Sequence, residues 1–453
     1  MAESTFSLET TFTSLLENKK YSTLRDILIT MNPADIAVLF DDLAENTLPL
    51  LFRLLPKELA AETFVEMDSD SQELLIRGFS DNELKEVVDE LYVDDAVDIV
   101  EEMPANVVSR ILRQANPEMR TTINEILKYP SDSAGSIMTT EFVSLAPSLT
   151  VEEAIKRIRR TGVDKETVNT CYVIDVGRHL IGTISLRVLV MANDEDLVED
   201  KMESNVISVN TLEDQETVAL MFRKYDFTAM PVVDGEERLV GIVTVDDAMD
   251  VMQDEATEDI EKMAAIIPSE SDRPYIKTNV FEIWKSRIPW LLLLMISATF
   301  TGMIITHFED ALASYVVLTA YIPMLMDTGG NSGSQASVTI IRGISLNELE
   351  FRDIFRVIWK EFRVSLMCGL TLAICNFVKL MLFDRVAFLV ALVICSTLVI
   401  TIIVAKLVGC TLPMLAHKIG FDPAVMASPF ITTIVDALSL LVYFRFASLI
   451  LGL

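Results

Sequence analysis

Carboxylates are the side chains that this sequence offers for chemistry. It has 67 aspartates and glutamates but only three histidines, and its five cysteines show no Cys-x-x-Cys or His-paired spacing. The chain therefore has few residues for acid–base or nucleophilic catalysis or for binding zinc, and an enzyme is not expected. Oxygen ligands are what hard cations such as Mg²⁺ and Ca²⁺ prefer.

The negative charge is confined to the first part of the chain. Residues 1–275 hold 56 acidic and 24 basic residues, whereas residues 276–453 hold 11 and 13. A nucleic-acid binder would need a basic face, so that class is excluded. An acidic region is thus joined to a nearly neutral, apolar one, and a length of 453 residues predicts about three domains.

Two acidic runs have the spacing of one helical face. Asp94 and Asp98 lie one turn apart, and residues 247, 250, 254 and 258 are all acidic and follow a spacing of three and four. Like charges so placed weaken a helix by roughly 0.3 kcal/mol per pair. Most such runs are solvated faces, but a divalent cation would turn the repulsion into bridging. Both interpretations stay open at this point.

Five apolar segments follow residue 275, at about 288–307, 312–341, 364–383, 386–415 and 426–451. Each approaches or exceeds the roughly 20 residues that a helix needs to cross a bilayer. Lysines and arginines precede the first segment and fill the 342–363 loop, so both regions are predicted to be cytoplasmic. No signal peptide is evident at the start of the sequence. Five spans place the C-terminus outside the cell.

Asp436 is the informative charge within these segments, because it falls about 12 Å into the last one. Ser428, Thr432, Ser439 and Tyr443 have the spacing to share its helical face. This oxygen-lined stripe is either a hydrogen-bonded helix–helix seam or an ion path. An unpaired carboxylate at mid-membrane favours the ion path.

A second polar stretch, residues 323–335, carries Gly329, Gly330, Asn331, Gly333 and Gln335. We expect it to break the helix and to release backbone carbonyls into a watery cavity, as transporters do at ion sites. The alternative is a close-packed helix crossing built on small residues. The neighbouring Asp327 and the two amide side chains favour the cavity.

Residues 138–252 contain an internal repeat. Residues 138–150 parallel 202–214 at an offset of 64, and residues 173–186 parallel 232–245 at an offset of 59. Each copy predicts a strand, an amphipathic helix, two apolar strands around an Asp/Gly turn and a second helix. This order resembles a tandem pair of CBS domains, the cystathionine-β-synthase modules that pair into a sensor.

In CBS domains a Ser/Thr-x-x-Asp turn often holds a nucleotide ribose. The second copy has Thr244 and Asp247 at these positions, but the first has Ser185 followed by Val188 where the aspartate is expected. ATP binding is therefore left open, with the second copy as its carrier. The candidate nucleotide contacts are Tyr172, Arg187, Phe227 and Thr244.

The sequence therefore predicts a multidomain chain. Residues 1–130 form an acidic all-α superhelical N-domain, because short apolar-periodic segments alternate with polar or proline breaks. Residues 131–252 form the α/β tandem CBS pair, with copies at about 138–198 and 202–252. Residues 253–275 form a connecting helix, and residues 276–453 form an all-α domain of five membrane spans.

The order of these parts, together with the Asp327–Gln335 signature, the Asp422-Pro turn and the run Glu255-Ala-Thr-Glu-Asp-Ile, resembles the MgtE family of magnesium channels and transporters. The resemblance implies a homodimeric, Mg²⁺-selective pore in the cell membrane, in contact with its lipid and with Asp436 as the filter carboxylate. It also implies that cytoplasmic Mg²⁺ holds the pore closed through the connecting "plug" helix, which approaches Asp422. The implied pore-lining or mouth residues are Gly329, Gly330, Asn331, Gln335, Asp422, Ser428 and Thr432.

The regulatory Mg²⁺ sites implied by the resemblance lie in the acidic part of the chain. Their candidate carboxylates are Asp94, Asp95, Asp98, Glu216, Asp226, Asp247, Asp250, Glu255, Glu258 and Asp259. Three alternatives stay open: a broader divalent carrier that also moves Co²⁺, a Mg²⁺ transporter coupled to another ion, and a nucleotide-sensing receptor that the spans merely anchor.

Overall fold

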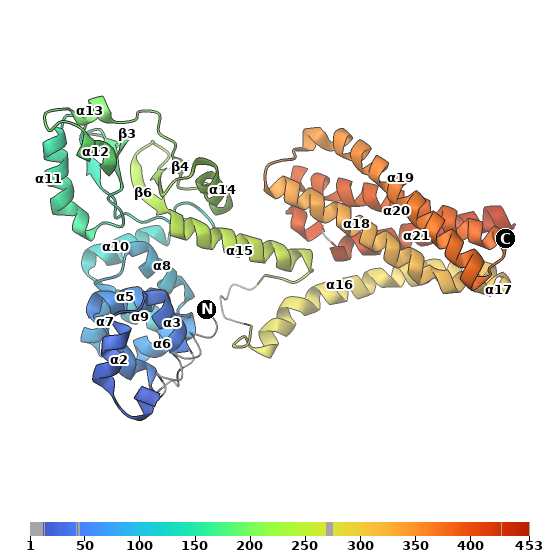
Figure 1. The fold of residues 1–453 in the computed structure, drawn as a ribbon, viewed down its shortest axis with the longest axis horizontal. Helices are drawn as coiled ribbons and strands as arrows, with labels where there is room; N and C mark the ends of the chain where they lie inside the picture. Colours follow the sequence, from blue (N-terminus) through green and yellow to red (C-terminus); the bar gives the residue numbers. More distant parts are fainter. Residues whose placement is uncertain are drawn as a thin grey trace. The chain divides into compact units, whose positions relative to one another are not determined.

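The computed structural model describes residues 12, 14–41, 43, 46–268, 275–426 and 428–452. It divides into two compact units, one of described residues up to Glu255 and one from Ala256 onward. Figure 1 shows the first unit in blue to green and most of the second in yellow to red. Each unit is described separately below.

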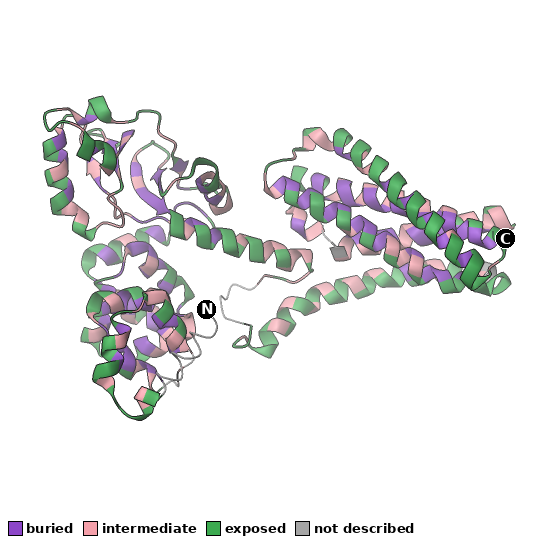
Figure 2. Cartoon of the chain, in the orientation of Figure 1, coloured by how far each residue is buried: buried purple, intermediate pink, exposed green. Residues whose placement is uncertain are grey.

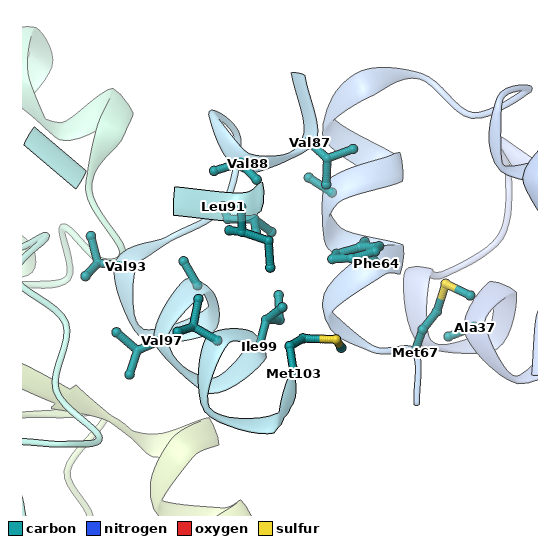
Figure 3. Packing of buried hydrophobic residues seen from close by; sticks show 14 of the residues in the cluster. Ala37, Phe64, Met67, Val87, Val88, Leu91, Val93, Val97, Ile99 and Met103 are labelled. Carbon is teal, nitrogen blue, oxygen red and sulfur yellow. The ribbon is translucent and has the colours of Figure 1, made fainter. Parts of the chain in front are cut away.

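The N-terminal part of the first unit is all helical, as predicted. Ser80 begins one helix with a capping box closed by Glu83, and Asn116 caps another directly before Pro117. The helices pack in alternation, α3 on α5, α5 on α7 and α7 on α9. Phe64, Leu91 and Val97 belong to the buried cluster that runs through this part of the unit (Figure 3). The helices are α2 (Tyr21–Leu28), α3 (Pro33–Asp41), α4 (Leu48–Phe52), α5 (Lys57–Val65), α6 (Ser69–Gly78), α7 (Asp81–Val88), α8 (Val93–Glu102), α9 (Ala105–Gln114) and α10 (Pro117–Ile126).

The internal repeat folds into two matching three-stranded sheets, which confirms the tandem prediction. In each sheet the first strand pairs in parallel with the second, and the second pairs antiparallel with the third. Gly182 and Gly241 occupy equivalent positions opposite Val173 and Val232. The first copy has β1 (Ser144–Leu145), α11 (Val151–Thr161), β2 (Thr170–Ile174), β3 (Leu180–Ser185), α12 (Leu186–Met191) and α13 (Val198–Lys201); the second has β4 (Val209–Asn210), α14 (Gln215–Tyr225), β5 (Ala229–Val233), β6 (Leu239–Thr244) and α15 (Val245–Met263).

The N-terminal helices and the second repeat share one hydrophobic core. Val97 and Ile123 belong to the same buried cluster as Met230, Val243 and Val251. The helical domain is therefore joined to the second CBS copy by apolar packing, and the start of α15 lies at this junction.

Helix α15 corrects one predicted boundary. The connecting helix was expected to begin at residue 253, but α15 runs from Val245 to Met263 without interruption. No glycine or proline falls within these residues to end it. The last helix of the second CBS copy and the connecting helix are one element, and the described part after Met263 is not helical until Val280.

Four helical segments of the described chain are long and apolar enough to cross a membrane: residues 280–307, 351–384, 388–418 and 423–451. The predicted second span, 312–341, is instead three consecutive pieces, of which α18 is the longest. Helix α18 is not among the four because its glycines and its hydroxyl and amide side chains lower its mean hydropathy. The elements of this unit are α16 (Val280–His307), α17 (Glu309–Ser314), a 3₁₀ turn (Val316–Tyr321), α18 (Ile322–Ser345), a 3₁₀ turn (Phe351–Asp353), α19 (Ile354–Lys379), a π turn (Leu380–Asp384), α20 (Phe388–Lys418), a 3₁₀ turn (Pro423–Met426) and α21 (Ser428–Leu451).

The predicted helix break at 323–335 is wrong. Helix α18 continues through Gly329, Gly330 and Gly333. A Cβ on Gly329 would meet Thr401 of α20, and one on Gly330 would meet Thr432 of α21. The glycines serve close packing among these helices, which is the alternative left open above. Figure 2 shows the buried faces of α18 and α20 in purple, whereas α16 is mostly exposed.

Candidate cation pathway and regulatory carboxylates

Helix α18 has a polar face on the side opposite its buried glycines. Asp327, Asn331 and Gln335 are spaced by four residues and are all exposed in the single chain. The buried glycines lie on the other side, against α20 and α21. The sequence motif therefore has two functions in one helix, tight packing on one face and an oxygen- and amide-bearing surface on the other.

Asp436 extends this surface from the neighbouring helix α21. It is half-buried, and Asp327 is the charged group whose field reaches it. Thr432 lies one turn before Asp436 and touches the Gly330 position of α18. Its hydroxyl donates to the Pro429 carbonyl over 2.9 Å, so its lone pairs stay available as acceptors. Two carboxylates from two packed helices thus share one partly open polar surface.

The rest of the predicted stripe on α21 does not join that surface. Ser439 is 2% exposed and lies against the Gly329 position. Tyr443 is fully buried and donates its hydroxyl hydrogen to the Leu318 carbonyl over 3.0 Å. At 3.6 residues per turn these positions stay within about 80° of one helical face, but beyond Asp436 that face is covered by the Gly329 position of α18 and by Leu318, so these two side chains are buried. The side chain of Ser428 lies outside the described residues.

Asp422 stands at the start of the turn that leads into α21. Its Oδ1 accepts the Ala424 N–H over 2.7 Å, and its Oδ2 accepts from the Lys262 ammonium over 2.6 Å. The same ammonium lies 2.7 Å from a carboxylate oxygen of Glu258. The structure therefore brings Asp422 together with the end of α15 through Lys262, a residue that sequence reasoning missed.

Acidic side chains from α8 and the start of α15 meet at the junction in the first unit. Asp94 is 6% exposed, and burial together with the charges of Asp247 and Asp95 holds its pKa well above the usual range. Burial and the charge of Asp247 raise the pKa of Asp95 to about 7. Burial raises the pKa of Asp247 to about 6, against the hydrogen bond that Thr244 donates. We call Asp94, Asp95 and Asp247 the junction carboxylates.

Further acids that the sequence reasoning did not select surround the junction carboxylates. Burial and the charge of Asp246 raise the pKa of Glu166 to about 7. Glu141 accepts the Val93 N–H over 3.1 Å, and burial raises its pKa as well. Both residues come from the chain between α8 and α15, many helical turns from either helix in sequence, so no local spacing could have indicated them. Burial is the main cause of these raised pKa values, and for Asp95 and Glu166 the charges of neighbouring carboxylates add to it.

Among the other predicted regulatory carboxylates, Asp98 adjoins the junction carboxylates, and the rest are dispersed. Burial and the charges of Asp247 and Asp95 raise the pKa of Asp98 to about 8. Glu255 accepts from the Gln215 amide over 3.0 Å, and Asp226 is exposed at the left-handed end of α14. Across the described residues no three His, Cys, Asp or Glu side chains are arranged to hold a metal ion. Glu216 and Asp250 lie on α14 and α15, and Glu258 and Asp259 belong to the second unit.

The predicted nucleotide contacts are only partly brought together. Tyr172 is fully buried, edge-on to Phe142 at 5.9 Å, and so it is a core residue and not a surface contact. Arg187 is exposed, and Phe227 stacks on Tyr225 at 5.6 Å. Thr244 donates to Asp247 over 2.5 Å at the first turn of α15. The threonine–aspartate pair expected of the second copy is present as a hydrogen-bonded unit.

These features define a class: a membrane transport protein whose soluble part couples a helical domain to a CBS pair. Residues 322–446 match a family described as "MgtE: divalent cation transporter", residues 31–132 match the "MgtE intracellular N domain", and residues 134–194 and 196–254 match CBS domains. The chain belongs to the MgtE family.

Two relatives match the chain along nearly all of its length. The magnesium transporter MgtE of Thermus thermophilus is 36% identical over 433 residues, covering 94% of this chain and 95% of its own. That of Bacillus subtilis is 33% identical, covering 96% and 95%.

Two solved structures match the soluble part. One, the cytosolic domain of the Mg²⁺ channel MgtE in complex with ATP, is 35% identical, with a TM-score of 0.51, over 54% of this chain and 99% of its own. The other, the soluble part of a magnesium transporter, is 32% identical with the same TM-score, over 56% and 100%.

Proposed function

We propose that this protein moves Mg²⁺ across the cell membrane along the surface that Asp436 shares with α18. The full-length relatives named above are magnesium transporters, and the chain covers 94–96% of its own length in matching them. The single observation that carries the proposal is the position of Asp436. A half-buried carboxylate on an apolar helix is costly in a membrane unless it faces water, protein or an ion.

The chemistry of this surface suits Mg²⁺. This ion dehydrates reluctantly, keeps several waters, and usually touches one or two carboxylates. In a homodimer, one Asp436 from each subunit across a two-fold axis supplies that number. Asn331 and Gln335, with the acceptor lone pairs of Thr432, receive hydrogens from the retained water shell. We propose α18 as a fifth membrane helix, which places the two termini on opposite sides of the membrane. The basic residues before the first span and in the 342–363 loop favour a cytoplasmic N-domain.

The junction carboxylates supply a regulatory element. Without divalent ions their confined negative charges repel one another and favour separation of the helical domain from the second CBS copy. A hard cation bound between the junction carboxylates removes this repulsion and favours the compact arrangement of the two domains. Because α15 begins at this junction and ends beside Asp422, the same ion that crosses the membrane can close its own path. This is negative feedback by the transported cation.

A second ligand is supported by one observation, the Thr244–Asp247 hydrogen bond of the second CBS copy. The solved relative of the cytosolic domain is a complex with ATP. We propose that ATP binds at the second copy, since Val188 replaces the aspartate in the first. Such binding would involve a junction carboxylate, and it would couple nucleotide to Mg²⁺ sensing through Asp247.

The test is ion flux in proteoliposomes that contain the full chain. Mg²⁺ should enter down its gradient, and Mg²⁺ on the side of the N-domain should reduce that entry. Comparable flux of Co²⁺ would favour the broader divalent carrier, and a requirement for a Na⁺ or H⁺ gradient would favour the coupled transporter. Absence of any divalent flux, with nucleotide binding retained, would favour the anchored receptor and overturn the proposal.

A further inference from the structure

A lysine ammonium occupies the space between carboxylates where the end of α15 meets the start of α21. Lys262 Nζ lies 2.6 Å from Asp422 Oδ2 and 2.7 Å from Glu258 Oε1. The side chains of Lys262, Glu258 and Asp422 are 20%, 39% and 34% exposed. All three belong to the second unit, so the contact lies within one compact body.

The residues next to Lys262 are packed against the rest of the second unit, so its ion pairs are part of a larger contact. Met263, the next residue, packs against Ile341 of α18 and the fully buried Ala424. Asp259, one turn earlier, accepts a hydrogen bond from Ser345 at the end of α18. Polar and apolar contacts together hold residues 256–263 against the end of α18 and the turn before α21.

Asp422 is itself fixed to the turn that begins α21. Its second oxygen accepts the Ala424 N–H at the start of the 3₁₀ turn Pro423–Met426. Helix α21, which carries Asp436, begins at Ser428. Asp422 therefore lies only six positions before the first residue of the helix that bears the proposed filter carboxylate.

The charges around Lys262 explain why a cation is needed there. Glu258, Asp259 and Asp422 bring three negative charges to one contact, and they would repel the end of α15 from the turn before α21. Lys262 supplies one positive charge from within the chain, already linked to the helix that it must hold. A bound divalent ion could supply the same neutralisation only when its concentration is high enough.

We propose that Lys262 is a positioning residue that acts as a resident cation. It holds residues 256–263 against Asp422 without Mg²⁺, and it lowers the Mg²⁺ concentration needed for closure. This inference rests on the proposed function for its effect on transport, whereas the contact itself can be tested independently. Without Lys262, the three carboxylates would have to recruit an external divalent ion to make the same contact.

The contact is tested by hydrogen exchange of the full chain in detergent with a chelator present. Lys262→Gln should speed exchange of the amides in 256–263 by roughly three- to five-fold, the change expected on removing a partly exposed ion pair. Lys262→Arg should leave exchange near the wild-type rate. Asp422→Asn should match Lys262→Gln, and the double variant should be no faster than either single one. Lys156→Gln is the matched control, because Lys156 pairs with Glu152 on the open surface of α11.

The gating consequence is tested by Mg²⁺ flux in proteoliposomes against Mg²⁺ on the side of the N-domain. Lys262→Gln should raise flux at zero Mg²⁺ on that side and shift closure to higher Mg²⁺, and Lys262→Arg should restore both. Unchanged exchange and an unchanged closing concentration in Lys262→Gln would overturn the inference. If the wild-type chain moves no Mg²⁺, the proposed function fails, and the exchange comparison alone decides whether Lys262 holds the contact.

Discussion

Gly333 of α18 and Gly409 of α20 cross so closely that a Cβ on Gly409 would collide with the Gly333 carbonyl oxygen. Backbone meets backbone at this point, and no side-chain movement can relieve the overlap. The crossing fixes the separation of α18 and α20, and α18 in turn presents Asp327 and Asn331 on its other face. The geometry of the polar surface therefore depends on two residues that have no polar side chain.

Gly409→Ala should destabilise the helical bundle by about 1–3 kcal/mol, the usual cost of forcing a methyl group into a filled core. Gly302→Ala is the matched control, since a Cβ there meets nothing within 4 Å and alanine is the better helix former. Thermal unfolding of the two variants in detergent measures the difference. An unfolding temperature for Gly409→Ala equal to that of Gly302→Ala would show that α18 and α20 are not so closely packed.

Because of the junction carboxylates, we expect the first unit to lose stability as the pH rises. The folded-state pKa values of Asp95 and Asp247 are raised to about 7 and about 6. A raised carboxyl pKa contributes stability that is fully present below the unfolded value, near pH 4, and is lost as pH rises through the folded value. In a chelator the first unit should therefore unfold at a lower temperature at pH 8 than at pH 5.5.

Added Mg²⁺ should recover more stability at pH 8 than at pH 5.5, because protons no longer neutralise the junction carboxylates at the higher pH. Asp95→Asn should flatten the pH profile and reduce the Mg²⁺ effect. Glu350→Gln, a change at an exposed acid in the second unit, serves as the control. An unfolding temperature in chelator that climbs steadily from pH 5.5 to pH 8 would contradict this explanation.

Several of these features follow from the sequence and several do not. The repeat offsets predicted both sheets, and the spacing of Asp94 and Asp98 identified the acidic face of α8, because these patterns are local. Glu166 and Lys262 were missed because each acts on a partner far away in the chain, and only the fold brings them together. The glycines of α18 were misread as a helix break, since glycine permits both a break and a close crossing and the choice depends on the opposing helix.

The nucleotide prediction concerns the hydrogen bond from Thr244 to Asp247. Thr244→Val should abolish ATP binding by the full chain, since it removes the hydroxyl of the Thr-x-x-Asp turn that follows β6, and the turn after β3 in the first copy lacks the aspartate. Ser185→Ala, in the copy that has Val188 instead of aspartate, should leave binding unchanged. Calorimetric titration with ATP measures both variants. Loss of binding in Ser185→Ala with retention in Thr244→Val would assign the site to the first copy.

The feedback proposal predicts the behaviour of a double variant at the junction. Asp95→Asn with Asp247→Asn removes the repulsion and the ligands together, so closure should lose most of its dependence on Mg²⁺. The steepness of the flux curve against Mg²⁺ on the side of the N-domain reports this loss. Neutralising Glu152 and Glu153, two exposed acids of α11, supplies a control with the same change in net charge. Closure at the wild-type Mg²⁺ concentration in the junction variant would place the regulatory ions elsewhere.

The most direct measurement of the central claim is Mg²⁺ flux through the full chain with Asp436→Asn, a change that keeps the shape of the side chain and removes its charge. Flux should fall to the level of empty proteoliposomes while the protein stays folded, because the substitution removes a costly buried charge and leaves no cation without a partner. Glu350→Gln should conduct like the wild type. Wild-type Mg²⁺ flux in Asp436→Asn would contradict the assignment of the cation pathway to this surface.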